Sequence, residues 1–368
     1  MSRVEELIAR IEHLSKHSIG YPISKDVHAD AVLPLLAYPL DNLGDPFIEG
    51  RYRLNTKQEE REVVSFMAHM FRPGSENIWG YVTNSGSEGN LYGIYLARER
   101  LDNPVVYYSS ETHYSVPKAC HLLHLASETV AVYSNGSTDL NALGEALARH
   151  PHRDAVVVAT IGTTMTEARD DVSAIRDLLD RYCVTARIHV DGALAGAYAG
   201  FGEEPIGYGF ADGADSISIS GHKFIGSPMP CGVVLARKKD VADVGKSIPV
   251  IGSFDSTIHG SRNGFAVALL WDALNRQGID GLETRYRAAR ALSIDITRKL
   301  CDAGLDAWQN PDALTVVFPC IDDEIASKWQ LACNGTWSHI IVMPGVTDKM
   351  LDEFLFDCTA VSTLRRLG

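Results

Sequence analysis

The residues with the clearest chemical meaning are a lysine and an aspartate that each follow a strand-like apolar run. The lysine is Lys223 in Ser220-Gly221-His222-Lys223, where its neighbours are small residues rather than the charged residues of a solvated helix. The aspartate is Asp191, which ends the apolar run Ile188-His189-Val190-Asp191. Taken singly, Lys223 is more often a surface lysine, and Asp191 could equally well cap a helix. Together they indicate a site, because ligands in open α/β sheets bind at the carboxyl ends of strands.

A third stretch has the composition of a phosphate-binding turn. Thr83-Asn84-Ser85-Gly86-Ser87-Glu88-Gly89-Asn90 consists mainly of small residues and leads into a helical pattern. Small residues at a helix N-terminus leave backbone N–H groups free to bind phosphate. The stretch has neither the Gly-Lys-Ser/Thr of a P-loop nor the Gly-x-Gly-x-x-Gly of a dinucleotide site. His113, which follows another apolar run, adds an imidazole, although a lone histidine is more often structural.

This combination of groups meets the chemical requirements of pyridoxal 5'-phosphate. The lysine would form a Schiff base with the cofactor, the aspartate would keep its ring nitrogen protonated, and the histidine would stack on the ring. At ~3 Å and an effective dielectric constant of ~20, one carboxylate stabilises a pyridinium by about 5 kcal/mol before desolvation is subtracted. One aspartate is therefore sufficient to make the ring an electron sink, and we predict this cofactor rather than a nicotinamide.

The elements that must position these residues follow an alternating pattern. Helical patterns alternate with short β-branched runs from about residue 60, which predicts βαβ units and a mainly parallel sheet in an α/β fold. The expected strands of this sheet are 105–109, 130–134, 155–162, 187–191, 215–220 and 232–236. Helical patterns at 264–277 and 283–303, strand-like runs at 314–318 and 340–343, and a helix from Asp348 predict a smaller α+β unit.

We expect three parts along the chain. Residues 1–50 contain amphipathic stretches and turns but no independent core, so this segment is expected to wrap the partner subunit. Residues 51–262 would form the large cofactor-binding domain, and residues 263–368 the small C-terminal domain. The chain has no Gly/Ser linker between the two domains, so an extensive interface between them is expected.

Several further motifs occur in order along the chain: Asn42-Leu43-Gly44-Asp45-Pro46-Phe47, Trp79-Gly80-Tyr81-Val82-Thr83-Asn84, His113-Tyr114-Ser115, Ile161-Gly162-Thr163-Thr164, Gly260-Ser261-Arg262-Asn263-Gly264 and Trp329-Gln330-Leu331-Ala332-Cys333. With these motifs the chain resembles the group II pyridoxal-phosphate-dependent amino-acid decarboxylases, in the branch of bacterial histidine decarboxylases and plant serine decarboxylases. The resemblance implies an aspartate-aminotransferase-type fold (fold type I) and a homodimer with its active site at the subunit interface. It also implies α-decarboxylation of an L-amino acid, with histidine to histamine ahead of serine to ethanolamine.

The resemblance also assigns roles by motif position. Lys223 would be the Schiff-base lysine, Asp191 the partner of the ring nitrogen and His113 the stacking residue, and these three would be catalytic. Ala193 would contact the opposite face of the ring. The residues around the phosphate would be Gly86, Ser87, Thr164, Ser220 and His222. Thr163 stays an alternative to Thr164, and Tyr21 and Asn42 are candidates to line the pocket of the partner subunit.

The chain departs from the family in the mobile loop before Gly260. Related decarboxylases carry there a tyrosine that is expected to protonate the carbanionic intermediate, whereas residues 247–260 contain no tyrosine and Val250 occupies the matching position. His259 and His222 are the candidates to replace it. Without an acid, oxidative decarboxylation to an aldehyde is the alternative outcome. Transamination and a non-catalytic binding or regulatory relative are further alternatives, and the lysine, aspartate and histidine together argue against the latter.

Composition excludes several other classes. The chain has 34 Lys and Arg against 47 Asp and Glu, a formal charge of −13, and no basic cluster for duplex nucleic acid. Its first 18 residues mix both charges with apolar residues, unlike a signal peptide, and we expect a cytoplasmic protein without a membrane span. The seven scattered cysteines lack a Cys-x-x-Cys pair, which predicts reduced thiols rather than disulfides. His121 and His124 have no further ligand at suitable spacing, so no metal is expected.

Overall fold

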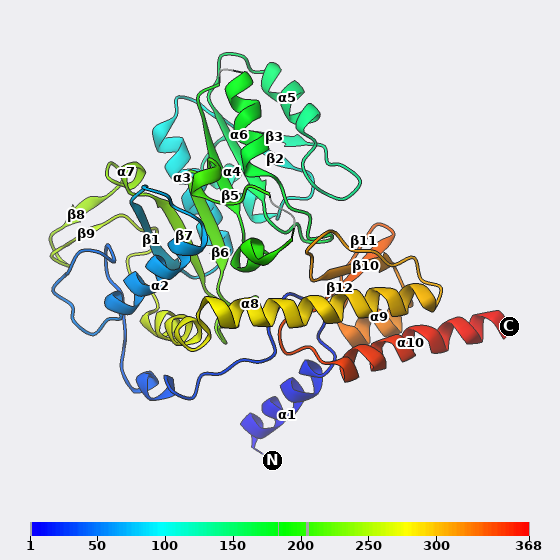
Figure 1. Cartoon of the computed structure of the whole chain (residues 1–368). Coiled ribbons are helices and arrows are strands. Elements are labelled where there is room, and N and C mark those ends of the chain that lie inside the picture. The colour runs from blue at the N-terminus through cyan, green and yellow to red at the C-terminus, as the bar shows by residue number, and fades with distance from the viewer. Residues whose placement is uncertain (1, 183, 204–205, 368) are drawn as a thin grey trace.

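The centre of the molecule is a seven-stranded sheet with the strand order β1-β7-β6-β5-β4-β2-β3. The computed structural model describes residues 2–182, 184–203 and 206–367, and Figure 1 shows this sheet in its upper part. The strands are β1 (Ile78–Thr83), β2 (Val105–Ser109), β3 (Ala126–Val130), β4 (Ala155–Thr160), β5 (Ala186–Asp191), β6 (Ser216–Ser220) and β7 (Gly232–Arg237). Neighbouring strands from β3 to β6 pair in parallel, and β7 is antiparallel to both β6 and β1. The predicted, mainly parallel α/β sheet is confirmed.

Helices cover both faces of this sheet, which explains why its central strands are buried on both faces. Every residue of β4 and β6 is buried. One face packs on α2 (Lys57–Met70), α5 (Leu140–Ala148), α6 (Val172–Arg181) and the first part of α8 (Gly264–Asp302). The other face packs on α3 (Gly86–Arg100) and α4 (Ser115–Leu122). The covered faces leave the strand ends as the places where polar side chains can gather.

A smaller antiparallel sheet, in the order β10-β12-β11, lies at the far end of α8 (Figure 1). Its elements are β10 (Thr315–Pro319), α9 (Asp323–Trp329), β11 (Cys333–Asn334), β12 (Trp337–Ile341) and α10 (Asp348–Leu367). The two helical patterns at 264–277 and 283–303 both fall in α8, which consists of two helical segments that meet at a kink at Gly278, where φ is 60° and ψ is −175°. Leu270 of α8 packs in the core of the large sheet and Leu300 in the core of the small one. The domain boundaries at 50 and 262 stay a prediction.

The N-terminal segment and the loops contain short elements. Helix α1 (Arg3–Ser15) begins at a capping box of Ser2 and Glu5 and buries none of its residues. The remaining elements are η1 (Leu33–Ala37), η2 (Gly196–Phe201), η3 (Phe210–Asp212), α7 (Lys238–Val241), β8 (Lys246–Ile248) and β9 (Ser253–Asp255). No helix in the described ranges combines the length and apolarity that crossing a membrane requires.

In the large sheet, the structure differs from the sequence prediction at two strands. The strand expected at 130–134 lies at 126–130, because β3 is an edge strand whose residues are mostly exposed and therefore carry little apolar signal. Strand β1 was not predicted. Among the described residues it pairs only with β7, a strand that follows much later in the chain.

The cysteine prediction was wrong at one pair. Cys320 and Cys333 form a disulfide, because the antiparallel pairing of β12 with both β10 and β11 brings their Cα atoms to 6.2 Å, within the range that a disulfide bridges. Cys120, Cys231 and Cys358 are buried and Cys301 is exposed, all as free thiols. Cys183 lies outside the described residues.

Candidate active site

The predicted chemical residues gather at one edge of the large sheet. Asp191 is the last residue of β5, and Lys223 lies just past the end of β6, the neighbouring strand. His113 follows β2 and Thr164 follows β4. These strands are adjacent and parallel, so their carboxyl ends meet at a single edge. This is the position where open α/β sheets bind their ligands.

The small residues around the start of α3 form a cradle. A Cβ atom added to Gly86 would lie 2.7 Å from Ser220 Oγ and 3.0 Å from Ala193 Cβ, so only glycine allows this approach. Ser218 Oγ donates a hydrogen bond of 3.0 Å to the Gly86 carbonyl, which holds the helix start against β6. In the described part of the chain, the hydroxyls of Ser87 and Ser220 have no protein partner. The cradle thus presents free hydroxyls beside the N–H groups of a helix N-terminus.

The two threonines that the sequence left unresolved have different surroundings. Thr163 is buried, and its hydroxyl lies 3.0 Å from Thr166 Oγ1 and accepts a 2.9 Å hydrogen bond from the backbone N–H of Ala168. Thr164 is exposed. The hydroxyl of Thr163 is therefore engaged in its own turn, whereas Thr164 is accessible from outside the turn.

His222 lies beside the lysine with its ring against a neighbouring backbone. Its Nδ1 is 2.8 Å from the carbonyl oxygen of Cys231. Burial lowers the pKa of His222, the bond to Cys231 opposes this shift, and the charge of Lys223 adds to it. The ring is thereby favoured in its neutral form beside the lysine.

Lys223, Asp191 and His113 interact electrostatically. Burial lowers the pKa of Lys223, and the negative charge of Asp191 partly offsets this effect. Burial also lowers the pKa of His113, with Asp191 opposing the shift and Lys223 adding to it. Within the described ranges, Nζ of Lys223 has no hydrogen-bond or ion-pair partner. A buried lysine amine that is easily deprotonated and not engaged elsewhere has the properties of a nucleophile.

Asp191 is held by two donors. Its Oδ2 accepts a hydrogen bond of 2.7 Å from Asn90 Nδ2, and its Oδ1 accepts one of 3.1 Å from the backbone N–H of Ala193. Sequence reasoning missed Asn90, although a signal was present. The spacing of Gly86, Gly89 and Gly93 on α3 marks a helix face that packs closely, and Asn90 lies on the same face.

These features fit pyridoxal phosphate. The Gly86 cradle suits the phosphate, the Lys223 amine is available to the aldehyde, and Asp191 has acceptor capacity left for a ring N–H. The predicted site residues Gly86, Ser87, His113, Thr164, Asp191, Ala193, Ser220, His222 and Lys223 all lie on α3 or on segments that end or follow β2, β4, β5 and β6.

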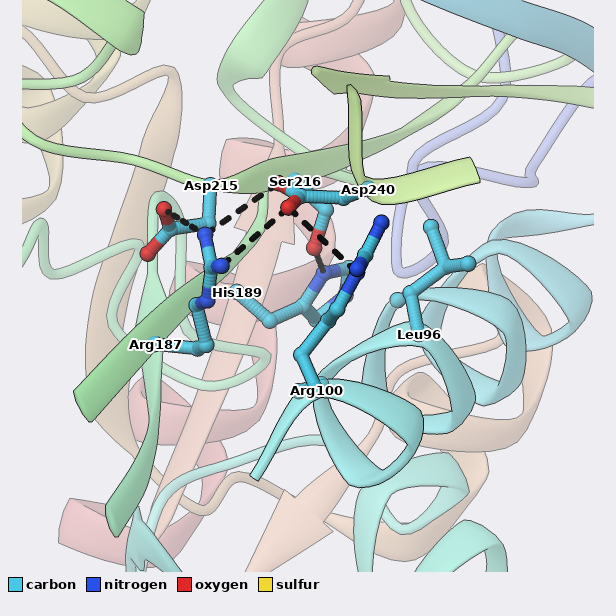
Figure 2. A pocket seen from close by; sticks show the side chains of 9 residues that line it. Leu96, Arg100, Arg187, His189, Asp215, Ser216 and Asp240 are labelled. Carbon is cyan, nitrogen blue, oxygen red and sulfur yellow. Dashed lines mark hydrogen bonds and ion pairs between the residues drawn. The ribbon is translucent and has the colours of Figure 1, made fainter. Parts of the chain in front are cut away.

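A cavity also lies at the opposite ends of the strands (Figure 2). It is lined by Gly93, Leu96, Ala97, Arg100, Arg187, His189, Asp215, Ser216 and Asp240. Its charges are paired, since Arg187 Nη1 lies 2.9 Å from Asp215 Oδ1 and Arg187 Nη2 lies 3.1 Å from Asp240 Oδ1. These compensated charges indicate a structural ion network behind the candidate site.

Comparisons with known proteins agree with this geometry. Residues 59–303 match the model of the pyridoxal-dependent decarboxylase conserved domain. The chain is 44% identical to a histidine decarboxylase of Mesorhizobium japonicum, over 96% of both chains. It is 35% identical to a histidine decarboxylase of Vibrio campbellii, over 97% of this chain and 95% of the relative.

Solved structures give the same assignment. L-methionine decarboxylase from Streptomyces sp. 590 superposes with a TM-score of 0.90 at 25% identity, covering 97% of this chain and 94% of that one. The predicted fold type I is thereby confirmed. The chain belongs to the pyridoxal-dependent decarboxylase family and is a carboxy-lyase that uses pyridoxal phosphate.

Proposed function

We propose that the enzyme converts L-histidine to histamine and carbon dioxide. The decarboxylase chemistry is carried by one observation, the buried amine of Lys223, which interacts with Asp191 and His113 at the carboxyl edge of the sheet. The choice of histidine is supported by the two bacterial relatives, each a histidine decarboxylase matched over nearly its full length. The alternative reaction is the conversion of serine to ethanolamine.

The residue roles are proposed from the same geometry. Lys223 would hold the cofactor through its aldehyde carbon, Asp191 would pair with the ring nitrogen, and His113 would stack on the ring above Ala193. Gly86, Ser87, Thr164, Ser220 and His222 would surround the phosphate. The exposure of Thr164 favours it over Thr163, which is buried and whose hydroxyl is engaged. When bound, the cofactor supplies the electron sink for the bond that breaks.

A proton must return to the substrate carbon, and the chain offers two histidines for this step. The position that carries a tyrosine in related enzymes holds Val250, which is 82% exposed and has no acidic group. His259 Nε2 lies 3.6 Å from Glu88 Oε2, on the first turn of α3 beside the cradle. His222 adjoins Lys223 in the chain. We propose His259 or His222 as the donor, because an imidazole N–H can serve as a general acid.

We also propose a homodimer with its active site at the interface. Helix α1 exposes an apolar stripe, and each of its members Val4, Leu7, Ile8, Ile11 and Leu14 is about half exposed or more. An exposed stripe of this kind is typical of an interaction surface. In the dimer, the segment 1–50 would cover the partner, while 51–262 and 263–368 would be the large and small domains. A cytoplasmic location stays a prediction from the sequence.

The test is a screen of the holoenzyme against the proteinogenic amino acids, with carbon dioxide, amine and oxygen all measured. We expect the fastest release of carbon dioxide from L-histidine, one histamine per carbon dioxide and no oxygen uptake. Faster release of carbon dioxide from L-serine would show that serine, and not histidine, is the preferred substrate. Oxygen consumption approaching one equivalent per carbon dioxide would establish the oxidative route, and no release from any amino acid would overturn the enzymatic function.

A further inference from the structure

Asn90 connects two of the groups proposed to act on the cofactor. It lies on α3 and is 1% exposed. Its Nδ2 donates hydrogen bonds to Asp191 Oδ2 at 2.7 Å and to Ser115 Oγ at 2.9 Å. Ser115 Oγ in turn lies 2.8 Å from Nδ1 of His113. One buried amide therefore contacts the aspartate directly and the histidine through a serine.

The remaining atom of the amide defines the state of a second histidine. Both protons of Asn90 Nδ2 are used, so Oδ1 must accept from His189 Nε2, at 3.0 Å. His189 Nδ1, 2.8 Å from Ser216 Oγ, then accepts the serine proton. Burial lowers the pKa of His189 to about 4, so the ring is neutral at pH 7. The reverse orientation of the amide would place its oxygen against the carboxylate of Asp191.

A neutral histidine behind the amide has an electrostatic consequence. A charged imidazolium in this position would compete with the cofactor ring for the negative charge of Asp191. The neutral chain Ser216, His189, Asn90 instead satisfies one carboxylate oxygen with an uncharged donor. The charge of Asp191 thus stays available to a ring nitrogen.

The packing of α3 makes this contact possible. A Cβ atom on Gly89 would collide with Ser218 Oγ, and one on Gly93 would collide with His189 Nδ1. The helix therefore lies closer to β5 and β6 than helices with side chains on this face can. Figure 2 shows His189 and Ser216 joined in the wall of the cavity, which Arg187, Asp215 and Asp240 also line. Ser216, the last member of this series of hydrogen-bonded side chains, is thus held in a fixed environment.

We propose that Asn90 is a positioning residue that fixes the carboxylate of Asp191 toward the ring nitrogen of the cofactor and couples it to His113 through Ser115. This inference rests on the proposed pairing of Asp191 with that nitrogen. A purely structural role of Asn90 predicts weaker binding of any cofactor. The positioning role predicts a loss of affinity that is larger for a cofactor with the ring nitrogen than for one without it.

The experiment compares the binding of pyridoxal phosphate with that of its 1-deaza analogue, in which a C–H replaces the ring nitrogen. Dissociation constants of both are measured by equilibrium dialysis for the parent enzyme, Asn90→Ala, Asn90→Asp and Asp191→Asn. The parent should prefer the natural cofactor. Asn90→Ala should reduce this preference about tenfold, the order of one hydrogen bond to a charged group. Asp191→Asn should abolish it.

A matched control is Asn310→Ala. Asn310 is also buried and its Nδ2 donates two hydrogen bonds, to the carbonyls of Asn135 and Thr166, away from Asp191. Its removal should leave the preference unchanged. If Asn90→Ala does not fold, Asn90→Asp retains the shape, and its added carboxylate beside Asp191 should make the preference depend on pH.

These outcomes separate the positioning role of Asn90 from the proposed role of Asp191. Equal weakening of both cofactors in the Asn90 variants, with the preference lost in Asp191→Asn, would overturn the positioning role and retain the role of Asp191. A preference unchanged in Asp191→Asn would overturn the proposed role of Asp191 itself. If Asn310→Ala lost as much of the preference for the natural cofactor as Asn90→Ala does, the effect would be one of general packing, and the inference would also be overturned.

Discussion

Lowering the pH should destabilise the fold through His189. This histidine is fully buried between α3 and the sheet, and burial lowers its pKa from about 6.5 to about 4, with Asp191 opposing the shift. Between these two values the unfolded chain binds a proton that the folded chain excludes. The contribution of neutral His189 to the free energy of unfolding is therefore fully present above pH 6.5 and is lost as the pH falls toward 4.

The size of the effect follows from the shift. One pKa unit corresponds to about 1.4 kcal/mol, so the free energy of unfolding should fall by about 2 kcal/mol between pH 7 and pH 5 through this residue alone. This is a sizeable share of the stability of an ordinary domain, about 5–15 kcal/mol. Other buried groups also titrate, so the contribution must be isolated as a difference.

The matched variant is His189→Gln, which keeps a donor for Asn90 Oδ1 but does not titrate. Urea unfolding of the cofactor-loaded parent and variant is measured from pH 7 to pH 5 at one protein concentration, because ligand and subunit association shift apparent stability. The stability advantage of the parent should shrink by about 2 kcal/mol across this range. Parallel curves would refute the conclusion that the fold holds His189 neutral.

Other perturbations should act on the site and the packing. Lys223→Ala should bind the cofactor without a covalent link, so a mass gain after borohydride treatment would contradict its role. Asp191→Asn should lower kcat by up to several powers of ten while weakening cofactor binding far less, because the amide keeps the shape of the side chain and loses its charge. A kcat within about threefold of the parent would contradict the proposed role of Asp191. Gly93→Ala should lower the urea midpoint, because its Cβ collides with His189, and an unchanged midpoint would argue against the close packing of α3. Alkylation of the unreduced, unfolded chain should label Cys120, Cys231, Cys301 and Cys358 but neither Cys320 nor Cys333, which are joined; labelling of Cys320 and Cys333 would disprove the disulfide.

Local sequence was sufficient wherever the determining signal lies within one element. The buried strand β4 was identified from its apolar run, because a strand covered by helices on both faces favours apolar side chains along its length. The buried strand β6 was identified from its isoleucines, which alternate with small serines. Lys223 and Asp191 were identified because each is a reactive residue directly after such a run. The strand-helix alternation then placed them at a common edge, since parallel pairing aligns the strand ends.

Features that depend on partners far apart in the chain were not accessible in this way. Strand β1 was missed because only its pairing with β7 makes it part of the sheet, and the disulfide was missed because its geometry depends on the pairing of β12. The same limit applied to the site. Sequence listed the groups that could bind the cofactor, but the choice of Thr164 over Thr163 depends on hydrogen bonds within a folded turn.

Asn90 illustrates the physical reason. Its residue type and its position after Gly89 were visible in the sequence, yet an asparagine can donate and accept in many ways. Only the close packing of α3 on β5 and β6 determines that it meets Asp191, Ser115 and His189. The sequence by itself determined which chemical groups this protein has and on which elements they lie. The tertiary structure decided which of those groups meet, because hydrogen bonds form only over distances that long-range packing sets.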